Sequence, residues 1–202
     1  MDYTLGVDLP SFLAIPEELE ARDFSHALDE LVDREYYITQ KHEGTSVVYV
    51  LIDDRFVVYN KREGYVSSEG YTPPEWTAAN ELLLKRRLQE YYLGQKVALY
   101  GVIDPRGDLI VHGVFFIEEQ MFATYVQLWA FCNEFGFDMA NLVDKGDKFR
   151  YSVEDLEAMA SKLKHKGKPT PGLVVRSQWP LRSTVLGKEW SLKVTNVNYQ
   201  KE

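Results

Sequence analysis

The 202-residue sequence is 45% hydrophobic and 27% charged, and it has no apolar run near the roughly 20 residues that cross a bilayer. These values exclude a membrane-spanning protein and a wholly disordered one, and they predict a single domain over residues 1–202. The formal charge of −8 excludes a protein that coats nucleic acid through bulk charge, so any polyanion has to be bound by a local basic surface.

The start of the chain and its cysteine content indicate the cellular compartment and the kinds of cysteine site to expect. The first residues, MDYTLGVDLPSFL, are acidic where a secretory signal is basic and lack a long apolar stretch, so we expect a cytoplasmic protein. The single cysteine, Cys132, cannot form an intramolecular disulfide or a cysteine-rich zinc site, and we expect it in the core.

The first half of the chain predicts two helices with strands between them. Residues 17–32 place apolar side chains near helical spacing and predict an amphipathic helix. Over residues 36–59, β-branched and aromatic runs predict one strand followed by a hairpin. Residues 75–93 hold strong helix formers and end before Gly94, a typical helix stop.

The second half continues the mixture of strands and helices. Residues 96–103 and 109–117 predict a strand pair that turns at 104–107, and helix signals return at 122–135 and 153–164. The remaining segments are a basic loop over 164–171 and short strands over 172–177 and 190–196. Strands paired mostly as hairpins, with helices between them, predict an α+β domain built on antiparallel sheet with flanking helices.

The segment Lys41-His42-Glu43-Gly44-Thr45-Ser46 lies between two predicted strands and carries a possible nucleophile. A lysine amine that loses its proton beside a phosphate-binding turn can attack the α-phosphorus of a nucleoside triphosphate and form a covalent lysyl-nucleotide. Glu43 can bind ribose hydroxyls, and Gly44 permits a close backbone approach. The alternative for so short a motif is a surface loop with an ordinary Lys-Glu pair.

Further segments of the sequence favour the covalent lysyl-nucleotide over the surface loop. The chain resembles the covalent nucleotidyltransferase superfamily of polynucleotide ligases and capping enzymes, in particular its RNA-ligase branch, whose motif I has the pattern K-x-(D/E)-G. In the order of that family, the segments that resemble motifs I, III, IIIa, IV and V are residues 41–46, 98–103, 114–117, 171–177 and 191–196. The resemblance implies an antiparallel-sheet, ATP-grasp-like ligase domain.

The resemblance also implies roles for individual residues. Lys41 would be the adenylated lysine, Glu43 would hold the ribose, and Lys193 would contact the α-phosphate. Phe116, rather than its neighbour Phe115, would stack on the purine, since strand alternation lets only one of the two face the site. The nucleotide-binding set is completed by Gln40, Gly44, Lys61 and Arg176.

Two positions depart from the family pattern. The family has a glutamate after the motif III glycine and another at the start of motif IV, where this sequence has Val102 and Pro171. Both glutamates serve the ribose or a divalent cation, and magnesium prefers oxygen ligands. The candidates to compensate at the metal site are Asp104, or Glu118 and Glu119 after motif IIIa, and the alternative is that all three are ordinary exposed acids at strand ends.

A basic segment provides the candidate nucleic-acid contacts. Clustered lysines neutralise phosphates without reading sequence, although such a cluster can equally be a solubilising surface. The residues assigned to this contact are Arg62, Lys164, Lys166 and Lys168.

These observations predict an ATP-dependent RNA ligase-like nucleotidyltransferase. Lys41 would take AMP from ATP with Mg²⁺, transfer it to a 5′-phosphate, and allow a 3′-hydroxyl to close the bond in RNA or at nicked duplex ends. The alternatives are a degenerate relative that binds nucleotide or nucleic acid without ligation, and a capping-type guanylyltransferase. Members of the superfamily commonly carry an appended oligonucleotide-binding or helical domain. We expect none in this chain, so a partner protein would supply that function if it is needed.

Overall fold

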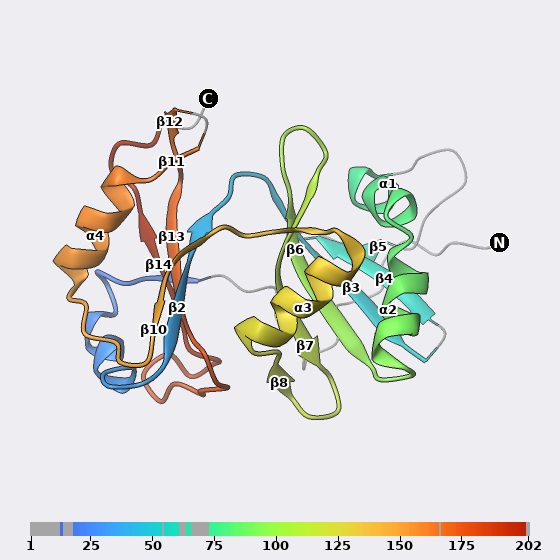
Figure 1. The fold of residues 1–202 in the computed structure, drawn as a ribbon, viewed down its shortest axis with the longest axis horizontal. Helices are drawn as coiled ribbons and strands as arrows, with labels where there is room; N and C mark the ends of the chain where they lie inside the picture. Colours follow the sequence, from blue (N-terminus) through green and yellow to red (C-terminus); the bar gives the residue numbers. More distant parts are fainter. Residues whose placement is uncertain are drawn as a thin grey trace. The chain divides into compact units, whose positions relative to one another are not determined.

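In the computed structural model, the chain forms two compact units (Figure 1). Unit 1 comprises Met1–Pro16 and Gly44–Met139, and unit 2 comprises Glu17–Glu43 and Ala140–Glu202. The structure describes residues 13, 18–53, 55–60, 64–65, 73–165 and 167–200.

A mostly antiparallel sheet forms the centre of unit 1. Its strands follow the order β5-β4-β3-β6-β7-β8, and β9 pairs in parallel with β7. The long strands are β3 (Thr45–Ile52), β4 (Arg55–Asn60), β6 (Val97–Ile103) and β7 (Leu109–Phe116), and the short ones are β5 (Gly64–Tyr65), β8 (Met121–Phe122) and β9 (Asp138–Met139). Their valine, isoleucine and aromatic content suits a pleated surface, and the predicted hairpins are confirmed.

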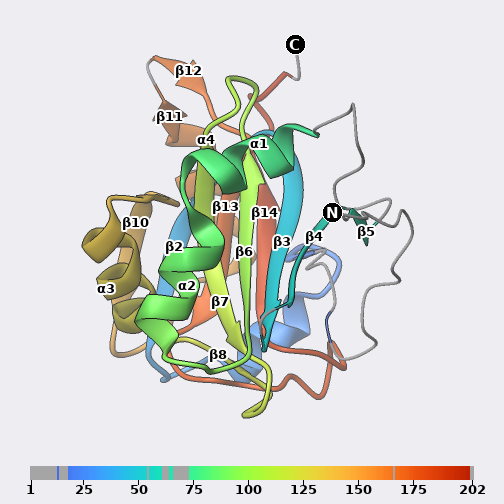
Figure 2. The ribbon, with the colours of Figure 1, turned by 90° about the vertical axis from the view of Figure 1, so that its right-hand side faces the viewer.

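Helices α1 (Pro74–Glu81), α2 (Leu84–Tyr92) and α3 (Tyr125–Phe135) pack on one face of this sheet (Figure 2). Side chains from all three helices join one core cluster with alternate residues of the strands, and this cluster includes Cys132, as expected. The other face of the sheet carries a separate cluster of strand side chains that includes Val48, Tyr59, Tyr100 and Phe115.

The sequence predicted one helix over residues 75–93, and the structure has two. Leu83 adopts a left-handed conformation with φ +52° and separates α1 from α2. The apolar residues are consistent with the break, because Ala78 and Leu84 would lie roughly 120° apart around a continuous helix of 3.6 residues per turn. With the turn at Leu83, both bury their side chains in the same core.

Unit 2 is built on a sheet with the strand order β1-β14-β13-β2-β10. The strands are β1 (Leu19–Glu20), β2 (Tyr36–Lys41), β10 (Leu142–Gly146), β13 (Gly172–Ser177) and β14 (Ser191–Thr195). Helix α4 (Val153–Lys162) lies along β13 and β14, begins with a capping box between Ser152 and Asp155, and buries Leu156 and Ala160 (Figure 1).

The predicted helix over residues 17–32 is wrong. Leu19 and Glu20 form the short strand β1, parallel to β14, and only Ser25–Glu30 forms a helical element, the 3-10 helix η1. The outer edge of β14 has unpaired backbone groups that accept this segment, and Ala21 N donates to the Lys193 carbonyl at 2.9 Å. Of the apolar residues that suggested a helix, Ala27, Leu28 and Leu31 are buried in the core of unit 2, whereas Val32 is exposed.

Candidate active site

Lys41 is the last residue of β2, a central strand of the unit 2 sheet. Register places it opposite Gly172 of β13, which in turn lies opposite Thr195 of β14. One step along, Thr39 lies opposite Val174, which lies opposite Lys193. Directly opposed residues project from the same face of a sheet. Lys41 and Lys193 therefore share a face, with Gly172 and Val174 of β13 between them.

The two faces of this sheet differ in character. Leu173, Val175, Leu192 and Val194 project to the side where α4 packs and belong to the core of unit 2. The side that carries Lys41 is largely polar, and we call it the polar face of unit 2. It carries Tyr37, Thr39, Lys41, Gly172, Val174, Arg176, Ser191, Lys193 and Thr195.

Two glutamates reach cations of the polar face: Glu18, directly before β1, and Glu20, within it. Glu18 Oε1 lies 2.8 Å from Arg176 Nη2 in a pair whose side chains are 15% (Arg176) and 11% (Glu18) exposed, and Arg176 Nη1 also donates to Thr39 Oγ1 at 3.2 Å. Glu20 Oε1 lies 3.6 Å from Lys193 Nζ. The buried first pair fixes the guanidinium in place, since breaking it would leave an uncompensated buried charge.

Lys41 differs from these two cations. Its side chain is half-buried, and it has no hydrogen-bond or ion-pair partner anywhere in the described part of the chain. A lysine amine without a carboxylate partner is available to a ligand. The polar face therefore offers one unpaired amine with two further cations on neighbouring strands.

Two glycines of the motifs have the same unusual backbone. Gly44 and Gly172 both have φ +145°, a conformation that side chains rarely adopt. A Cβ on Gly172 would lie 2.0 Å from the Val194 carbonyl oxygen, and one on Gly44 would lie 2.0 Å from the Ile103 oxygen and 2.6 Å from a methyl carbon of Val102. Glycine is therefore required where each of these strands begins.

Val102 stands where the family has the motif III glutamate, and it belongs to unit 1. Val102 lies opposite Ser46 of β3 and against Gly44. By strand alternation it shares the sheet face of Val48 and Tyr100, opposite the helices.

The structure distinguishes the two phenylalanines of motif IIIa. Phe116, the residue expected to stack on the purine, packs on the helix-covered side, and its ring centroid lies 5.6 Å from that of Tyr92. Phe115 lies on the opposite face with Tyr100 and Phe122. The expected alternation holds, and it puts Phe115 on the same face as Val102.

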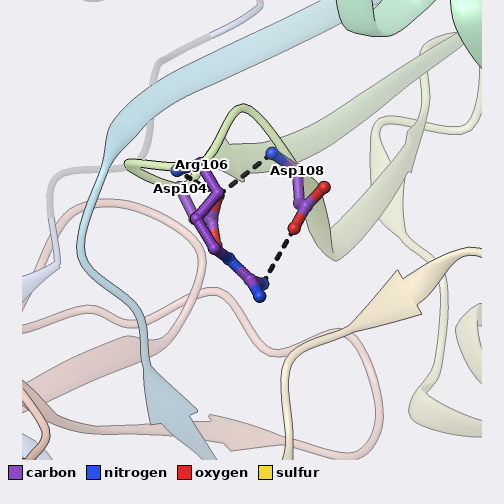
Figure 3. Close-up of polar contacts among 3 residues, drawn as sticks. All are labelled: Asp104, Arg106 and Asp108. Carbon is purple, nitrogen blue, oxygen red and sulfur yellow. Dashed lines mark hydrogen bonds and ion pairs between the residues drawn. The ribbon is translucent and has the colours of Figure 1, made fainter.

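Asp104 follows the end of β6 and is committed to the turn that joins β6 and β7 (Figure 3). Its Oδ1 accepts hydrogen bonds from the backbone N–H groups of Arg106 and Asp108, and its Oδ2 lies 3.0 Å from Arg106 Nε. Burial alone would raise the pKa of Asp104, but these hydrogen bonds and the arginine charge outweigh it and lower that pKa. A metal ion at Asp104 would have to displace Arg106.

The described residues do not form a preformed metal centre at the predicted positions. Within the described ranges, no group of three or more His, Cys, Asp or Glu side chains is arranged to hold a metal ion. Val102 and Pro171 offer no side-chain oxygen, and Asp104 is engaged by Arg106.

The other predicted nucleotide residues are placed as follows. Gln40 precedes Lys41 in β2 and therefore projects from the opposite face of the sheet. Its side chain is buried, and its side-chain oxygen accepts a hydrogen bond from Asn141 Nδ2 at 3.4 Å. Its amide oxygen thus has a partner already. Glu43 is half-buried in the connection that follows β2. Lys61 lies outside the described residues.

The predicted nucleic-acid contacts are partly described. Lys164 and Lys168 belong to a small antiparallel pair, β11 (Lys164–His165) with β12 (Lys168–Pro169), and both side chains are exposed. Arg62 and Lys166 lie outside the described residues.

Sequence reasoning missed Glu18, Glu20 and Thr39. No local pattern marked the two glutamates, because they reach the polar face only through the parallel pairing of β1 with β14. Thr39 could have been identified from the sequence, since it lies two residues before Lys41 and so projects from the same face of the strand.

Comparison with known proteins gives a clear result for the fold. A scan against protein-family models finds no match, and a search of curated proteins finds none either. Among solved structures, a mutant of Naegleria gruberi RNA ligase with ATP and Mn matches with a TM-score of 0.78 at 18% sequence identity, covering 94% of this chain and 58% of that chain. The same ligase with PPi also gives a TM-score of 0.78 at 18% identity, covering 93% and 57%.

This chain has the fold of an RNA ligase. The predicted α+β architecture with mostly antiparallel sheet is confirmed, and so is the predicted resemblance. The chain spans less than two thirds of the length of the Naegleria ligase structures it matches. None of the helices in the described residues has the length and apolar character of a bilayer span.

Proposed function

We propose that this chain is an ATP-dependent, RNA ligase-like nucleotidyltransferase in which Lys41 becomes covalently adenylated. The observation that carries this proposal is the position of Lys41 on the polar face of unit 2. It is unpaired there, with Arg176 and Lys193 on neighbouring strands, in a chain with the fold of an RNA ligase.

The first step joins Lys41 to AMP. The neutral Lys41 Nζ attacks the α-phosphorus of ATP, a nitrogen–phosphorus bond forms, the bond to the β-phosphate oxygen breaks, and pyrophosphate leaves. Lys193 and Arg176 supply positive charge for the phosphate oxygens as negative charge builds on them. The amine's proton passes to solvent.

The later steps use the same face. The AMP passes from Lys41 to the 5′-phosphate of a polynucleotide, which restores the free amine. A 3′-hydroxyl oxygen then attacks that phosphate, a phosphodiester bond forms, and AMP leaves. Exposed Lys164 and Lys168 are proposed to contact the polynucleotide backbone, because lysine ammonium groups neutralise phosphates irrespective of sequence.

The base is proposed to stack on Phe115 rather than Phe116. Phe115 lies on the sheet face of unit 1 that also carries Val102 and Tyr100, whereas Phe116 is packed against Tyr92. An aromatic ring stacks on a base through its π-face without reading sequence, and the choice of Phe115 rests on the sheet face that it shares with Val102.

The direct test is incubation with ATP labelled at the α-phosphate, followed by denaturation and measurement of label on the protein. We expect label on the wild type and none on Lys41→Ala. Lys148→Ala removes an exposed lysine of the same unit and is the matched control, which should label like the wild type. Absence of label on the wild type, or equal label on Lys41→Ala, would refute the proposal.

A second candidate function has a specific observation in its favour. No acid cluster in the described part of the chain fits a divalent cation, and Val102 and Pro171 stand where the family has glutamates. A chain that binds nucleotide or polynucleotide ends without forming the covalent adduct would explain this. Equilibrium binding of ATP with no label at any divalent-metal concentration would select this second function, and labelling by GTP in preference to ATP would select a capping-type activity.

A further inference from the structure

The two ion pairs that Glu18 and Glu20 make on the polar face differ in separation and exposure. The Glu18–Arg176 pair has a separation of 2.8 Å and side chains that are at most 15% exposed. The Glu20–Lys193 pair has a separation of 3.6 Å and side chains that are 31% (Glu20) and 32% (Lys193) exposed. A looser, more solvated pair contributes little stability, so it is the one that an incoming anion can open.

Glu20 is also held by a neighbour. Thr195 Oγ1 donates a hydrogen bond to Glu20 Oε1, the same oxygen that faces Lys193. The carboxylate is thus kept at Lys193 by one hydrogen bond and one weak ion pair.

A cavity provides a second position for this carboxylate. The cavity has a volume of about 210 Å³, and Glu20, Thr195 and Arg22 are among its lining residues. Arg22 is paired with Glu157 across the same cavity at 2.7 Å. Asp23 and Glu157 also line this cavity, and Glu157 already binds Arg22 through two hydrogen bonds, so the cavity offers a displaced Glu20 carboxylate open space rather than a new ion pair.

We propose that Glu20 is a built-in competitor for the phosphate groups that Lys193 binds, and that it thereby sets the affinity of the polar face for polyphosphates. This inference rests on the proposed function, in which Lys193 binds nucleotide phosphate. Phosphate oxygens take the place of the Glu20 carboxylate at Lys193, and Glu20 turns toward the cavity. Glu20 acts through Lys193 and is a positioning residue.

The test measures equilibrium binding of inorganic pyrophosphate to the full chain. Glu20→Gln removes the charge but keeps an oxygen that can accept from Thr195. Because the Glu20 side chain is only partly buried, removal of its competing charge should tighten pyrophosphate binding by about 3- to 5-fold. Glu157→Gln makes the same change of charge at the same cavity, but its partner is Arg22, and it should change binding by less than about 2-fold.

A double-mutant cycle identifies the residue through which Glu20 acts. In a Lys193→Met background, the gain from Glu20→Gln should fall below about 2-fold, because the competition has been removed. A merely structural role for Glu20 would not depend on Lys193 in this way. If Glu20→Gln does not fold, Glu20→Ala carries the same expectation.

The outcomes separate the two proposals. Binding by the wild type with no gain in the Glu20 variants overturns the inference alone, and so does an equal gain in Glu157→Gln, which would indicate a long-range charge effect. Failure of every variant and of the wild type to bind pyrophosphate overturns the proposed function together with the inference.

Discussion

Replacement of Gly172 by alanine should destabilise unit 2 far more than an ordinary glycine substitution. The backbone at Gly172 has φ +145°, and an alanine Cβ would lie 2.0 Å from the Val194 carbonyl oxygen of the neighbouring strand. The unfavourable conformation costs about 1–3 kcal/mol, and the overlap with a backbone atom adds a further 1–3 kcal/mol or so because β13 must shift against β14. We expect a total loss of about 2–6 kcal/mol.

Gly187 provides the matched control. It also has a positive φ, +68°, and belongs to the same unit, but a Cβ there would meet nothing within 4 Å. Gly187→Ala should therefore cost only about 1 kcal/mol, the conformational part. The difference between the two variants measures the contact with Val194 together with the less favourable φ of Gly172.

Urea unfolding followed by tryptophan fluorescence measures both variants, with the buried Trp190 of unit 2 as a reporter. The same shift of β13 against β14 would displace Lys193 relative to Lys41, so Gly172→Ala should also bind ATP more weakly than Gly187→Ala. Equal free energies of unfolding for the two alanine variants would refute the close approach of these strands.

Three further predictions concern charge and the nucleotide. Hydrogen bonds from Ser183 and Thr184 lower the pKa of Glu30 from 4.5 to about 2, so the stability they provide is present above pH 4.5 and is lost as the pH falls toward 2. After discounting for solvent screening we expect about 1 kcal/mol, measured as a flatter acid-unfolding curve for Glu30→Gln. Phe115→Leu should weaken ATP binding several-fold while Phe116→Leu should mainly lower the melting temperature, and the reverse pattern in calorimetry would assign stacking to Phe116. Pro171→Glu, next to Gly172 of the polar face, should make labelling by ATP more dependent on manganese concentration; unchanged metal dependence would show that this position does not face the phosphates.

Much of the fold could be predicted because its strands are continuous runs of β-formers. Residues 45–52 and 97–103 bury side chains on both sheet faces, so their composition alone identified them. The helix over 17–32 failed because its apolar spacing reflects burial in the core, while the free edge of β14, distant in sequence, decides its backbone. The break at Leu83 had no local marker, since it follows from which residues the sheet of unit 1 buries.

For the candidate site, the positions of residues on the sheet could be predicted where they follow from strand order and register. Lys41 and Lys193 share a face because of the register of β2, β13 and β14, and ordered motifs anticipated their association. Single residues were harder to assign, because Asp104 binds its own turn and Phe116 packs against Tyr92. Those outcomes depend on side-chain partners that no spacing rule specifies.

The central claim is that the Lys41 amine bonds to AMP, and peptide mapping by mass spectrometry after incubation with ATP tests it most directly. The account predicts that the mass of one AMP is added to the peptide that contains Lys41 and that fragmentation places it on that side chain. An adduct on Lys193 or another lysine, or an unmodified Lys41 peptide at saturating ATP, would contradict it.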